Sequence, residues 1–352
     1  MSNIVILGAG LMGTALSVPL ADNGHAIRLV GTHLDGDIIE EIHESRVHPK
    51  LRVRVADSVE PYTYDRLAEA LRGADLVVLG VNSRGVNWAA KMLGPLLPPS
   101  VPVLAVTKGL AGDERGLHIL PDVLRAGLPG GVREAVKISA IGGPSIAGEL
   151  AARRHTCVVF TGPDQALLDR LAGLLRTPYY HVWTSTDMVG VEVCVALKNV
   201  YSLAVGLVHG LLEKEGTAGN GAVMHNLAAA LFAQGLWEMA YMVDTMGGQQ
   251  RSVFTLPGAG DQYVTSMGGR TVRLGRLLGK GLSYEQARAE MAGETLESAF
   301  VVEQIAKALP GLEARGLLGR DELPLTRCLC RVITGNAPLD LEFDRLFQDD
   351  VK

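Results

Sequence analysis

Lys198 is the residue of this sequence that most clearly suggests chemistry, because it lies in an almost wholly apolar stretch, VALKNVYSLAVGL at residues 195–207. On a helix, its neighbours three and four positions away include Cys194, Tyr201 and Ser202. Burial disfavours the charged form of an ammonium group and lowers its pKa, so the proton becomes available to a reacting oxygen near neutral pH. The pattern therefore predicts a general acid. The alternative is a lysine that reaches the surface along its methylene stem.

Candidate partners of Lys198 come from the glycine-rich residues 256–281. Asp261 follows Gly-Ala-Gly, a loop that permits close approach, and its carboxylate is suited to orient an ammonium group. Arg270 follows two glycines, where a guanidinium can bind a phosphate through two hydrogen bonds. Asn199, next to Lys198, offers an amide donor of similar reach. Helix capping by Asp261, a surface salt bridge of Arg270 and a buried, hydrogen-bonded Asn199 are the alternatives.

A glycine pattern near the N-terminus predicts a dinucleotide site. The segment ILGAGLMGTAL, residues 6–16, contains G-x-G-x-x-G, follows an apolar strand and opens a helix. In that setting Gly8 permits the tight turn, Gly10 lets the backbone approach a pyrophosphate, and Gly13 packs the helix against the strand. The N–H groups at the start of the helix point at the anion. An ordinary glycine-rich turn between strand and helix is the alternative.

The end of the second strand leaves both NAD and NADP open. In RLVGTHLDGD, residues 28–37, no carboxylate appears before Asp35 at the place where an acidic residue holds a ribose hydroxyl. Thr32 or His33 is able to hydrogen-bond a 2′-phosphate there, which allows NADP. Asp35 can still fold back onto a ribose, which allows NAD.

Two further strand ends carry groups that bind anions. Lys108 directly follows an apolar strand in residues 103–114, and such a lysine can pair with a phosphate or a developing oxyanion. In residues 139–150, Gly143 and Ser145 flank a proline and present N–H groups and a hydroxyl at the start of a helix. A solvated loop lysine and a capped turn are the respective alternatives.

The distribution of apolar residues predicts two domains. Up to residue 186, apolar runs rich in Val and Ile alternate with helix-like stretches, which indicates an α/β domain with a mostly parallel sheet. These runs are 4–7, 26–30, 76–81, 103–106, 136–141, 157–160 and 180–183. From residue 187 to 352 the strand signal disappears and helical periodicity predicts an all-α domain. Its expected helices are 188–212, 221–246, 284–291 and 295–309.

Composition narrows the class of protein. Of the 352 residues, 47% are hydrophobic and 20% charged, which is typical of a globular chain with a sizeable core. A net charge of −5 argues against nucleic-acid or anionic membrane partners. The four cysteines lack a zinc spacing and are expected to be reduced, with no metal bound. The N-terminus has no leader pattern, and polar residues interrupt every apolar stretch before about 18 residues, so we expect a cytoplasmic protein without a membrane segment.

The whole pattern resembles the NAD(P)-dependent glycerol-3-phosphate dehydrogenase family over nearly the full length. The matching segments are GAGLMG (8–13), TKGL (107–110), GGPSIAGE (142–149), DMVGVEVCVALKNVYSLAVG (187–206), GAGDQYVTSMGGR (258–270), LGKGLS (278–283) and VVE (301–303). The resemblance implies a Rossmann-like N-terminal domain with a helical C-terminal domain, a homodimer, and a role in glycerophospholipid metabolism. It also implies reversible hydride transfer between NAD(P)H and the C2 carbonyl of dihydroxyacetone phosphate.

The same resemblance implies roles for individual residues. Lys198 matches the family's proton donor and acceptor, supported by Asp261, with Lys108 as a further catalytic residue. The substrate-binding residues that the resemblance implies are Lys108, Gly143, Ser145, Thr265 and Arg270. Asn199 and Thr271 are added to them because they directly follow Lys198 and Arg270. The implied cofactor-binding residues are Gly8, Gly10, Leu11, Met12, Gly13, Thr32, Lys108, Ala147, Arg270, Val301 and Glu303.

Two residues depart from the family's pattern and keep other functions open. Thr271 replaces an asparagine after the phosphate-binding arginine, and a hydroxyl offers fewer donors than an amide. Gln304 replaces a glycine, where it would crowd the nicotinamide or replace a lost hydrogen bond. The alternatives are a family member that acts on another polyol phosphate or anionic hydroxyketone, a reductase of the ketopantoate or opine type, and a non-catalytic NAD(P)-binding regulator.

Overall fold

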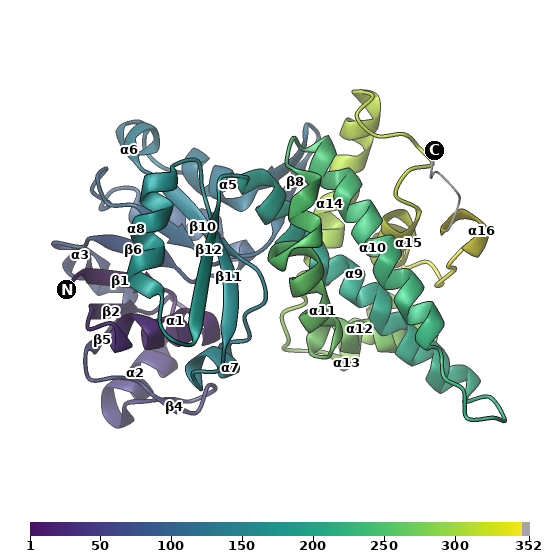
Figure 1. Cartoon of the computed structure of the whole chain (residues 1–352), viewed down its shortest axis with the longest axis horizontal. Helices are drawn as coiled ribbons and strands as arrows, with labels where there is room; N and C mark the ends of the chain where they lie inside the picture. The colour runs from purple at the N-terminus through teal and green to yellow at the C-terminus, as the bar shows by residue number, and fades with distance from the viewer. Residues whose placement is uncertain (347–352) are drawn as a thin grey trace. The chain divides into compact units, whose positions relative to one another are not determined.

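The computed structural model describes residues 1–346, and the chain divides into two compact units (Figure 1). Unit 1 consists of residues 1–108 and 120–188, and unit 2 of residues 109–119 and the chain from 189 onward. The predicted boundary between 186 and 187 lies close to the break after Met188. The assignment of 109–119 to the first domain was wrong, because this segment packs within unit 2.

Unit 1 contains an eight-stranded sheet in its described residues, in the order β12-β11-β10-β7-β6-β1-β2-β5. Its strands are β1 (Asn3–Leu7), β2 (Ala26–Val30), β5 (Val59–Tyr62), β6 (Leu76–Leu79), β7 (Val103–Ala105), β10 (Ile138–Gly142), β11 (Thr156–Thr161) and β12 (Tyr180–Ser185). Among these pairs only β10 and β11 run antiparallel, which confirms the mostly parallel, Rossmann-like sheet. A small hairpin, β3 (Val47–His48) and β4 (Val53–Arg54), stands apart from it.

Both faces of this sheet are covered by helices. Ile4 and Ile6 of β1 belong to one apolar cluster, while Val5 and Leu7 belong to another, as alternation along a strand buried on two sides requires. The helices of unit 1 are α1 (Leu11–Asp22), α2 (Gly36–Ser45), α3 (Leu67–Ala70), α4 (Val86–Leu93), α5 (Leu120–Ala126), α6 (Gly130–Ala135), α7 (Ala147–Ala151) and α8 (Gln165–Leu175).

Unit 2 is mainly helical. Its helices are α9 (Met188–Glu215), α10 (His225–Thr245), α11 (Asp261–Ser266), α12 (Arg270–Gly279), α13 (Tyr284–Glu290), α14 (Glu297–Ala314), α15 (Pro324–Gly335) and α16 (Phe343–Leu346). The predicted all-α segment is confirmed, since the described residues from 187 to 346 form helices and no strand. The hairpin β8 (Leu110–Asp113) and β9 (Gly116–Ile119), from earlier in the chain, packs on α14. At Gly112 a Cβ would lie 1.9 Å from the carbonyl oxygen of Gln304, so the two backbones touch.

The helix α9 is longer than the sequence suggested. It is long and apolar enough to cross a membrane by length and composition, yet 89% of its apolar window is buried inside the structure. The expectation that no apolar stretch reaches spanning length was wrong, because Lys198 and Asn199 are accommodated inside one continuous helix. Burial on this scale is typical of the core helix of a globular unit.

Candidate active site

The loop after β1 has the geometry that a dinucleotide requires. Gly8 has a φ of 113°, and a Cβ there would lie 2.7 Å from the backbone of Gly80. A Cβ at Gly13 would lie 2.1 Å from the carbonyl oxygen of Gly8, which shows how closely α1 approaches the strand. Around Gly10 no described atom lies within 4 Å of the Cβ position. Since Gly10 has no side chain to cap α1, the N–H groups of the first turn are available to an anion.

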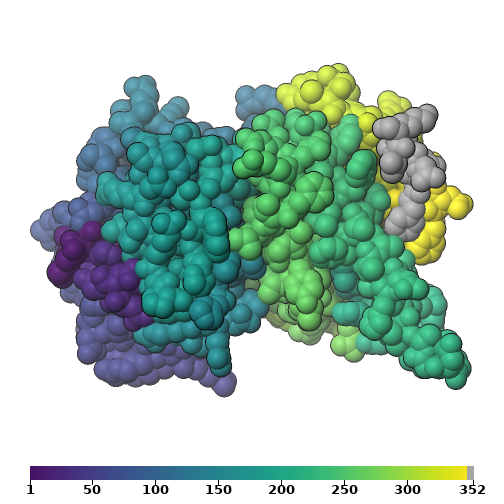
Figure 2. All heavy atoms as spheres, in the orientation of Figure 1, coloured from purple at the N-terminus to yellow at the C-terminus, as the bar shows by residue number. Residues whose placement is uncertain are grey.

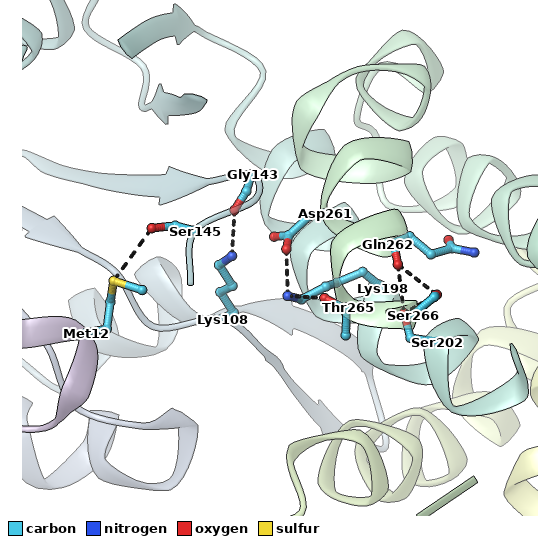
Figure 3. A network of polar contacts seen from close by, with 10 residues as sticks. All are labelled: Met12, Lys108, Gly143, Ser145, Lys198, Ser202, Asp261, Gln262, Thr265 and Ser266. Carbon is cyan, nitrogen blue, oxygen red and sulfur yellow. Dashed lines mark hydrogen bonds and ion pairs between the residues drawn. The ribbon is translucent and has the colours of Figure 1, made fainter. Parts of the chain in front are cut away.

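Two other strand ends of unit 1 are joined by a hydrogen bond. The Nζ of Lys108 donates to the carbonyl oxygen of Gly143 at 2.8 Å (Figure 3). The hydroxyl of Ser145 donates to the Sδ of Met12 at 3.8 Å, and Ala147 begins α7, which packs on α1. The predicted convergence of residues at the carboxyl edge of the sheet is therefore present within unit 1.

Thr32 and Asp35 form a closed turn at the end of β2. The Oδ2 atom of Asp35 accepts hydrogen bonds from the backbone N and the Oγ1 of Thr32, both at 2.8 Å. The Thr32 hydroxyl is thus held by a carboxylate, and the expected contact of Asp35 with a ribose stays a prediction. The ring of His33 packs against Trp88, with ring centroids 5.2 Å apart. The role of Thr32 in cofactor binding stays a prediction.

In unit 2, Lys198 has the partner that its surroundings predicted. Its Nζ donates to the Oδ1 of Asp261 at 2.7 Å and to the Oγ1 of Thr265 at 2.9 Å (Figure 3). The side chains are 12% and 1% exposed for Lys198 and Asp261, so the ion pair is almost entirely inside the protein. The alternative of a lysine extended to the surface was wrong. The arrangement holds an ammonium group in one orientation by means of a charged partner.

A set of hydroxyl groups beside this pair was not singled out from the sequence. Ser202 and Ser266 both donate to the carbonyl oxygen of Gln262, at 3.1 and 2.8 Å, and Ser266 also donates to Ser202. The Nε2 of Gln262 donates to the carbonyl oxygen of Phe232 at 3.1 Å. These bonds attach α11 to α9 and α10, and so fix the helix that carries Asp261. The sequence feature that could have indicated this network is Ser202, a polar residue one helical turn after Lys198.

Four glycines that sequence reasoning also missed let α12 touch α9. A Cβ at Gly206 or Gly210 would lie 2.6 or 2.0 Å from backbone oxygens of α12. A Cβ at Gly275 or Gly279 would lie 2.2 or 2.0 Å from backbone oxygens of α9. The sequence feature that could have indicated this contact is the spacing of four residues between the two glycines in each helix. Close contact of the two backbones fixes α12, whose first residue is Arg270.

Arg270 and Thr271 occupy the start of α12. Gly269, with a φ of 89°, precedes the helix and has no side chain to cap it. The exposed guanidinium, the hydroxyl and the first N–H groups of the helix together make a site suited to an anion. The structure places both residues on the helix after α11, outside the hydrogen-bond network of Lys198.

The remaining predicted residues of unit 2 differ in accessibility. Asn199 is 9% exposed, and the side chain of Val301 is fully buried, whereas Glu303 is partly exposed. The Oε1 of Gln304 accepts a hydrogen bond from the backbone N of Gly112 at 3.2 Å. Gln304 therefore binds the β8 hairpin within its own unit, and both roles expected for it towards the nicotinamide side stay predictions.

Each unit thus brings together part of the predicted site. In unit 1 the glycine loop, Lys108, Gly143 and Ser145 meet at one sheet edge; in unit 2 Lys198, Asp261 and Thr265 form one network. The first group suits a dinucleotide and the second suits proton transfer. Within residues 1–346 no group of three or more metal-ligating side chains is found, and the four cysteines are free thiols.

Comparison with known protein families gives a consistent match. Residues 3–168 match the model of the N-terminus of NAD-dependent glycerol-3-phosphate dehydrogenase. Residues 187–343 match the model of the C-terminus of the same family. Together the two models extend over most of the chain, in the same order as the two units.

Relatives of similar length carry the corresponding names. The chain is 37% identical over 288 residues to the NADP(+)-dependent glycerol-3-phosphate dehydrogenase of Archaeoglobus fulgidus, covering 82% of this chain and 83% of the relative. It is 34% identical over 338 residues to the NAD(P)+ glycerol-3-phosphate dehydrogenase of Geobacillus kaustophilus, covering 95% and 90%.

Solved structures show the same architecture. The crystal structure of glycerol-3-phosphate dehydrogenase from Coxiella burnetii aligns with a TM-score of 0.81 at 27% identity, covering 98% of this chain and 97% of that one. The enzyme from Saccharomyces cerevisiae aligns at 0.80 with 19% identity over 99% of both chains, which supports the fold alone. A ketopantoate reductase from Ralstonia eutropha aligns at only 0.53 with 19% identity, over 98% and 99%.

Proposed function

The chain belongs to the NAD-dependent glycerol-3-phosphate dehydrogenase family, and from this premise we propose that it interconverts dihydroxyacetone phosphate and sn-glycerol 3-phosphate with NADH or NADPH. The observation that carries the proposal is the ion pair of Lys198 and Asp261, held by Thr265 in a nearly buried position. A protein that only sensed a dinucleotide would not need this pair.

Lys198 is the proposed proton donor in the direction of reduction. Its ammonium group donates a proton to the C2 oxygen of the substrate, and in the reverse direction the amine removes the proton from the C2 hydroxyl. Asp261 and Thr265 restrict the orientation of the ammonium group before substrate binds. Such prior alignment lowers the entropic cost of reaching the transition state.

Unit 1 contains the proposed binding site for the pyrophosphate of the cofactor. The open space at Gly10 and the uncapped start of α1 fit a pyrophosphate, with Leu11, Met12 and Gly13 in the first turn. A nicotinamide supplies or accepts the hydride when it is bound. The other proposed cofactor contacts are Thr32, Lys108, Ala147, Arg270, Val301 and Glu303.

The start of α12 is the proposed phosphate-binding part. Arg270 offers a planar pair of donors, and the adjacent N–H groups and the hydroxyl of Thr271 add to it. Binding energy from the phosphate then orients the reacting carbonyl. The other proposed substrate contacts are Lys108, Gly143, Ser145, Asn199 and Thr265.

Thr271 favours a second candidate function. A hydroxyl at this position is shorter than the amide of the family pattern, which leaves room beside Arg270 for a different anionic group. The second candidate is therefore a dehydrogenase of another polyol phosphate or anionic hydroxyketone.

One assay separates the candidates. Consumption of NADH and NADPH, followed by absorbance, is measured with dihydroxyacetone phosphate and with a panel of other phosphorylated or anionic hydroxyketones. The highest kcat/KM with dihydroxyacetone phosphate supports the first function, and a higher value with another ketone supports the second. Binding of the cofactor without turnover of any ketone would overturn both.

We also propose that the protein is a cytoplasmic homodimer that supplies glycerophospholipid metabolism. Trp237 of α10 is 59% exposed, and aromatic residues are enriched at protein interfaces, which supports an interface between copies. The loop before α10 projects from the rest of unit 2 in the space-filling view (Figure 2). Light scattering coupled to size-exclusion chromatography tests the dimer, and a monomer at micromolar concentration would contradict it.

A further inference from the structure

The two peptide groups that flank the Ala9 Cα, inside the dinucleotide loop, are both held by residues outside that loop. The backbone N of Ala9 donates to the Oδ2 of Asp35 at 3.3 Å. The carbonyl oxygen of Ala9 lies 3.0 Å from the Nε2 of His48 and accepts from the hydroxyl of Thr14 at 3.2 Å. Asp35 precedes α2 and His48 belongs to β3, so two separate elements reach the same residue.

The contacts of His48 define its hydrogen positions. Its Nδ1 accepts from the backbone N of Lys50 at 3.2 Å and of Leu51 at 3.0 Å. A nitrogen that accepts two N–H groups carries no hydrogen, so the hydrogen is on Nε2 and is donated to Ala9. The ring is fully buried, and burial lowers the pKa of His48 below its ordinary value. The ring is therefore a neutral donor in a single tautomer.

Asp35 is held just as firmly. The same Oδ2 atom that accepts from Ala9 also accepts the two hydrogen bonds from Thr32. Its carboxylate thus joins the end of β2 to the loop after β1. Both partners of Ala9 are consequently anchored before any cofactor arrives.

Ala9 needs such support because glycines flank it. Gly8 and Gly10 have little steric restriction, so the intervening peptide groups can rotate easily in the absence of other contacts. Rotation of these peptide groups would change the direction of the N–H groups that follow them at the start of α1. Binding a pyrophosphate to a mobile loop would then require the loop to be ordered first.

We propose that Asp35 and His48 are positioning residues that fix the two peptide groups flanking the Ala9 Cα and thereby preorganise the loop for the dinucleotide. The inference rests on the proposed binding of the cofactor by residues 8–13. His48, which is fully buried, acts only through Ala9. The hairpin of β3 and β4 therefore has a function in cofactor affinity although it is not part of the main sheet.

The test measures the affinity for NADH and NADPH directly, by isothermal titration calorimetry of the full chain. His48→Leu removes both the donor and the acceptor and is expected to raise the Kd about tenfold. His48→Gln restores a donor at a similar reach and should recover part of the affinity. Asp35→Ala should weaken binding to a similar extent, and Asp35→Asn less. In the steady state the loss should fall mainly on the KM for the cofactor rather than on kcat.

His43→Leu is the matched control, because His43 is an exposed histidine on the neighbouring α2. The double variant Asp35→Ala with His48→Leu should lose less affinity than the two single losses combined, since both act on the backbone of the same residue, Ala9. Each Kd is measured well below the unfolding temperature of that variant. A merely structural role would lower that temperature without changing the Kd.

An unchanged Kd in folded His48→Leu and Asp35→Ala would overturn the proposal. If His48→Leu does not fold, an unchanged Kd in His48→Gln and Asp35→Ala would overturn the proposal instead. Failure of this proposal and failure of the proposed function give different results for the wild type. If the wild type binds the dinucleotide tightly but turns over no ketone, the proposed function fails and the role of Asp35 and His48 in binding is unaffected. A wild type that binds neither dinucleotide would overturn both.

Discussion

Lys198 and Asp261 form an ion pair that is nearly excluded from water, and at the level of single residues this is the strongest indication of catalysis. We expect Lys198→Ala to lower kcat by about 100-fold or more, because the C2 oxygen loses its proton donor. Binding of NAD(P)H, measured separately, should be kept. Lys214→Ala is the matched control, since Lys214 is exposed at the other end of the same helix. Turnover close to that of wild type would refute the role of Lys198.

Arg270 has a different expected effect because it is exposed at the start of α12 and is proposed to bind the phosphate group. Arg270→Ala should raise the KM for dihydroxyacetone phosphate by about tenfold or more, with a smaller effect on kcat. Arg288→Ala, on the exposed surface of α13, is the control. Initial rates over a range of substrate concentration decide the matter, and an unchanged KM would place the phosphate elsewhere.

Some contacts of this site could be predicted from the sequence and others could not. The ion pair could be predicted because an ammonium group in an apolar helix requires a carboxylate partner, and Asp261 lies in a glycine-rich loop. The contacts of Asp35 and His48 with Ala9 could not be predicted from the sequence, because the two side chains are distant in the chain from the backbone groups that they bind. No local pattern encodes such a pairing.

At the scale of helices, Glu238 caps α15 from inside the protein. Its carboxylate accepts from the backbone N of Leu325 at 2.7 Å, and from the backbone N and Oγ1 of Thr326 at 2.8 and 2.6 Å. Glu238→Ala leaves these donors buried without an acceptor. We expect the free energy of unfolding to fall by about 2–4 kcal/mol. Urea unfolding checks this, and a loss below 0.5 kcal/mol, about the size of an ordinary surface substitution, would argue against the cap.

The same carboxyl group should make stability depend on pH. Burial raises the pKa of Glu238 above its ordinary value of 4.5. Between the unfolded and the folded pKa the folded protein binds more protons, so the contribution of Glu238 to stability decreases as the pH rises through this range. Glu238→Gln does not titrate and should lack this decrease. Unfolding of both proteins over a pH series is the measurement, and equal slopes would contradict the expectation.

The contact between α9 and α12 gives a sharper test of packing. Gly275→Ala would place a Cβ 2.2 Å from the carbonyl oxygen of Leu203, so the helices must separate, at a cost of about 1–3 kcal/mol. Gly173→Ala in α8 is the matched control, because no described atom lies within 4 Å of its Cβ position. There alanine should be neutral or stabilising, by up to about 1 kcal/mol. Equal effects of the two changes on thermal unfolding would show that the close contact is unimportant.

The strands of unit 1 were predictable because most of their residues are apolar. Every expected apolar run of unit 1 is a strand, as is typical of a sheet covered on both faces. β5 was missed because its sequence, VEPY, contains a charge and a proline at the edge of the sheet. α12 was missed because glycines, which are poor helix formers, are required there by contact with α9.

At the scale of the whole molecule, cofactor binding and proton transfer are expected to be separable. Saturating NADH or NADPH should raise the unfolding temperature, since a ligand at 100 times its Kd stabilises by about 2.7 kcal/mol. Lys198→Ala should show the same shift, because Lys198 is proposed to act on the substrate and is not among the proposed cofactor contacts. Differential scanning calorimetry checks this. A shift that disappears in Lys198→Ala would mean that the lysine contributes to holding the cofactor.

The chain passes from one unit to the other after residues 108, 119 and 188. A gene fragment that stops at residue 186 would therefore encode the 109–119 hairpin without α14, the helix on which it folds. Chimeras between relatives face the same constraint, since a single crossover would exchange one unit together with a piece of the other. A chimera that keeps both units intact needs three junctions, and residues 109–119 have to come from the same parent as the rest of unit 2.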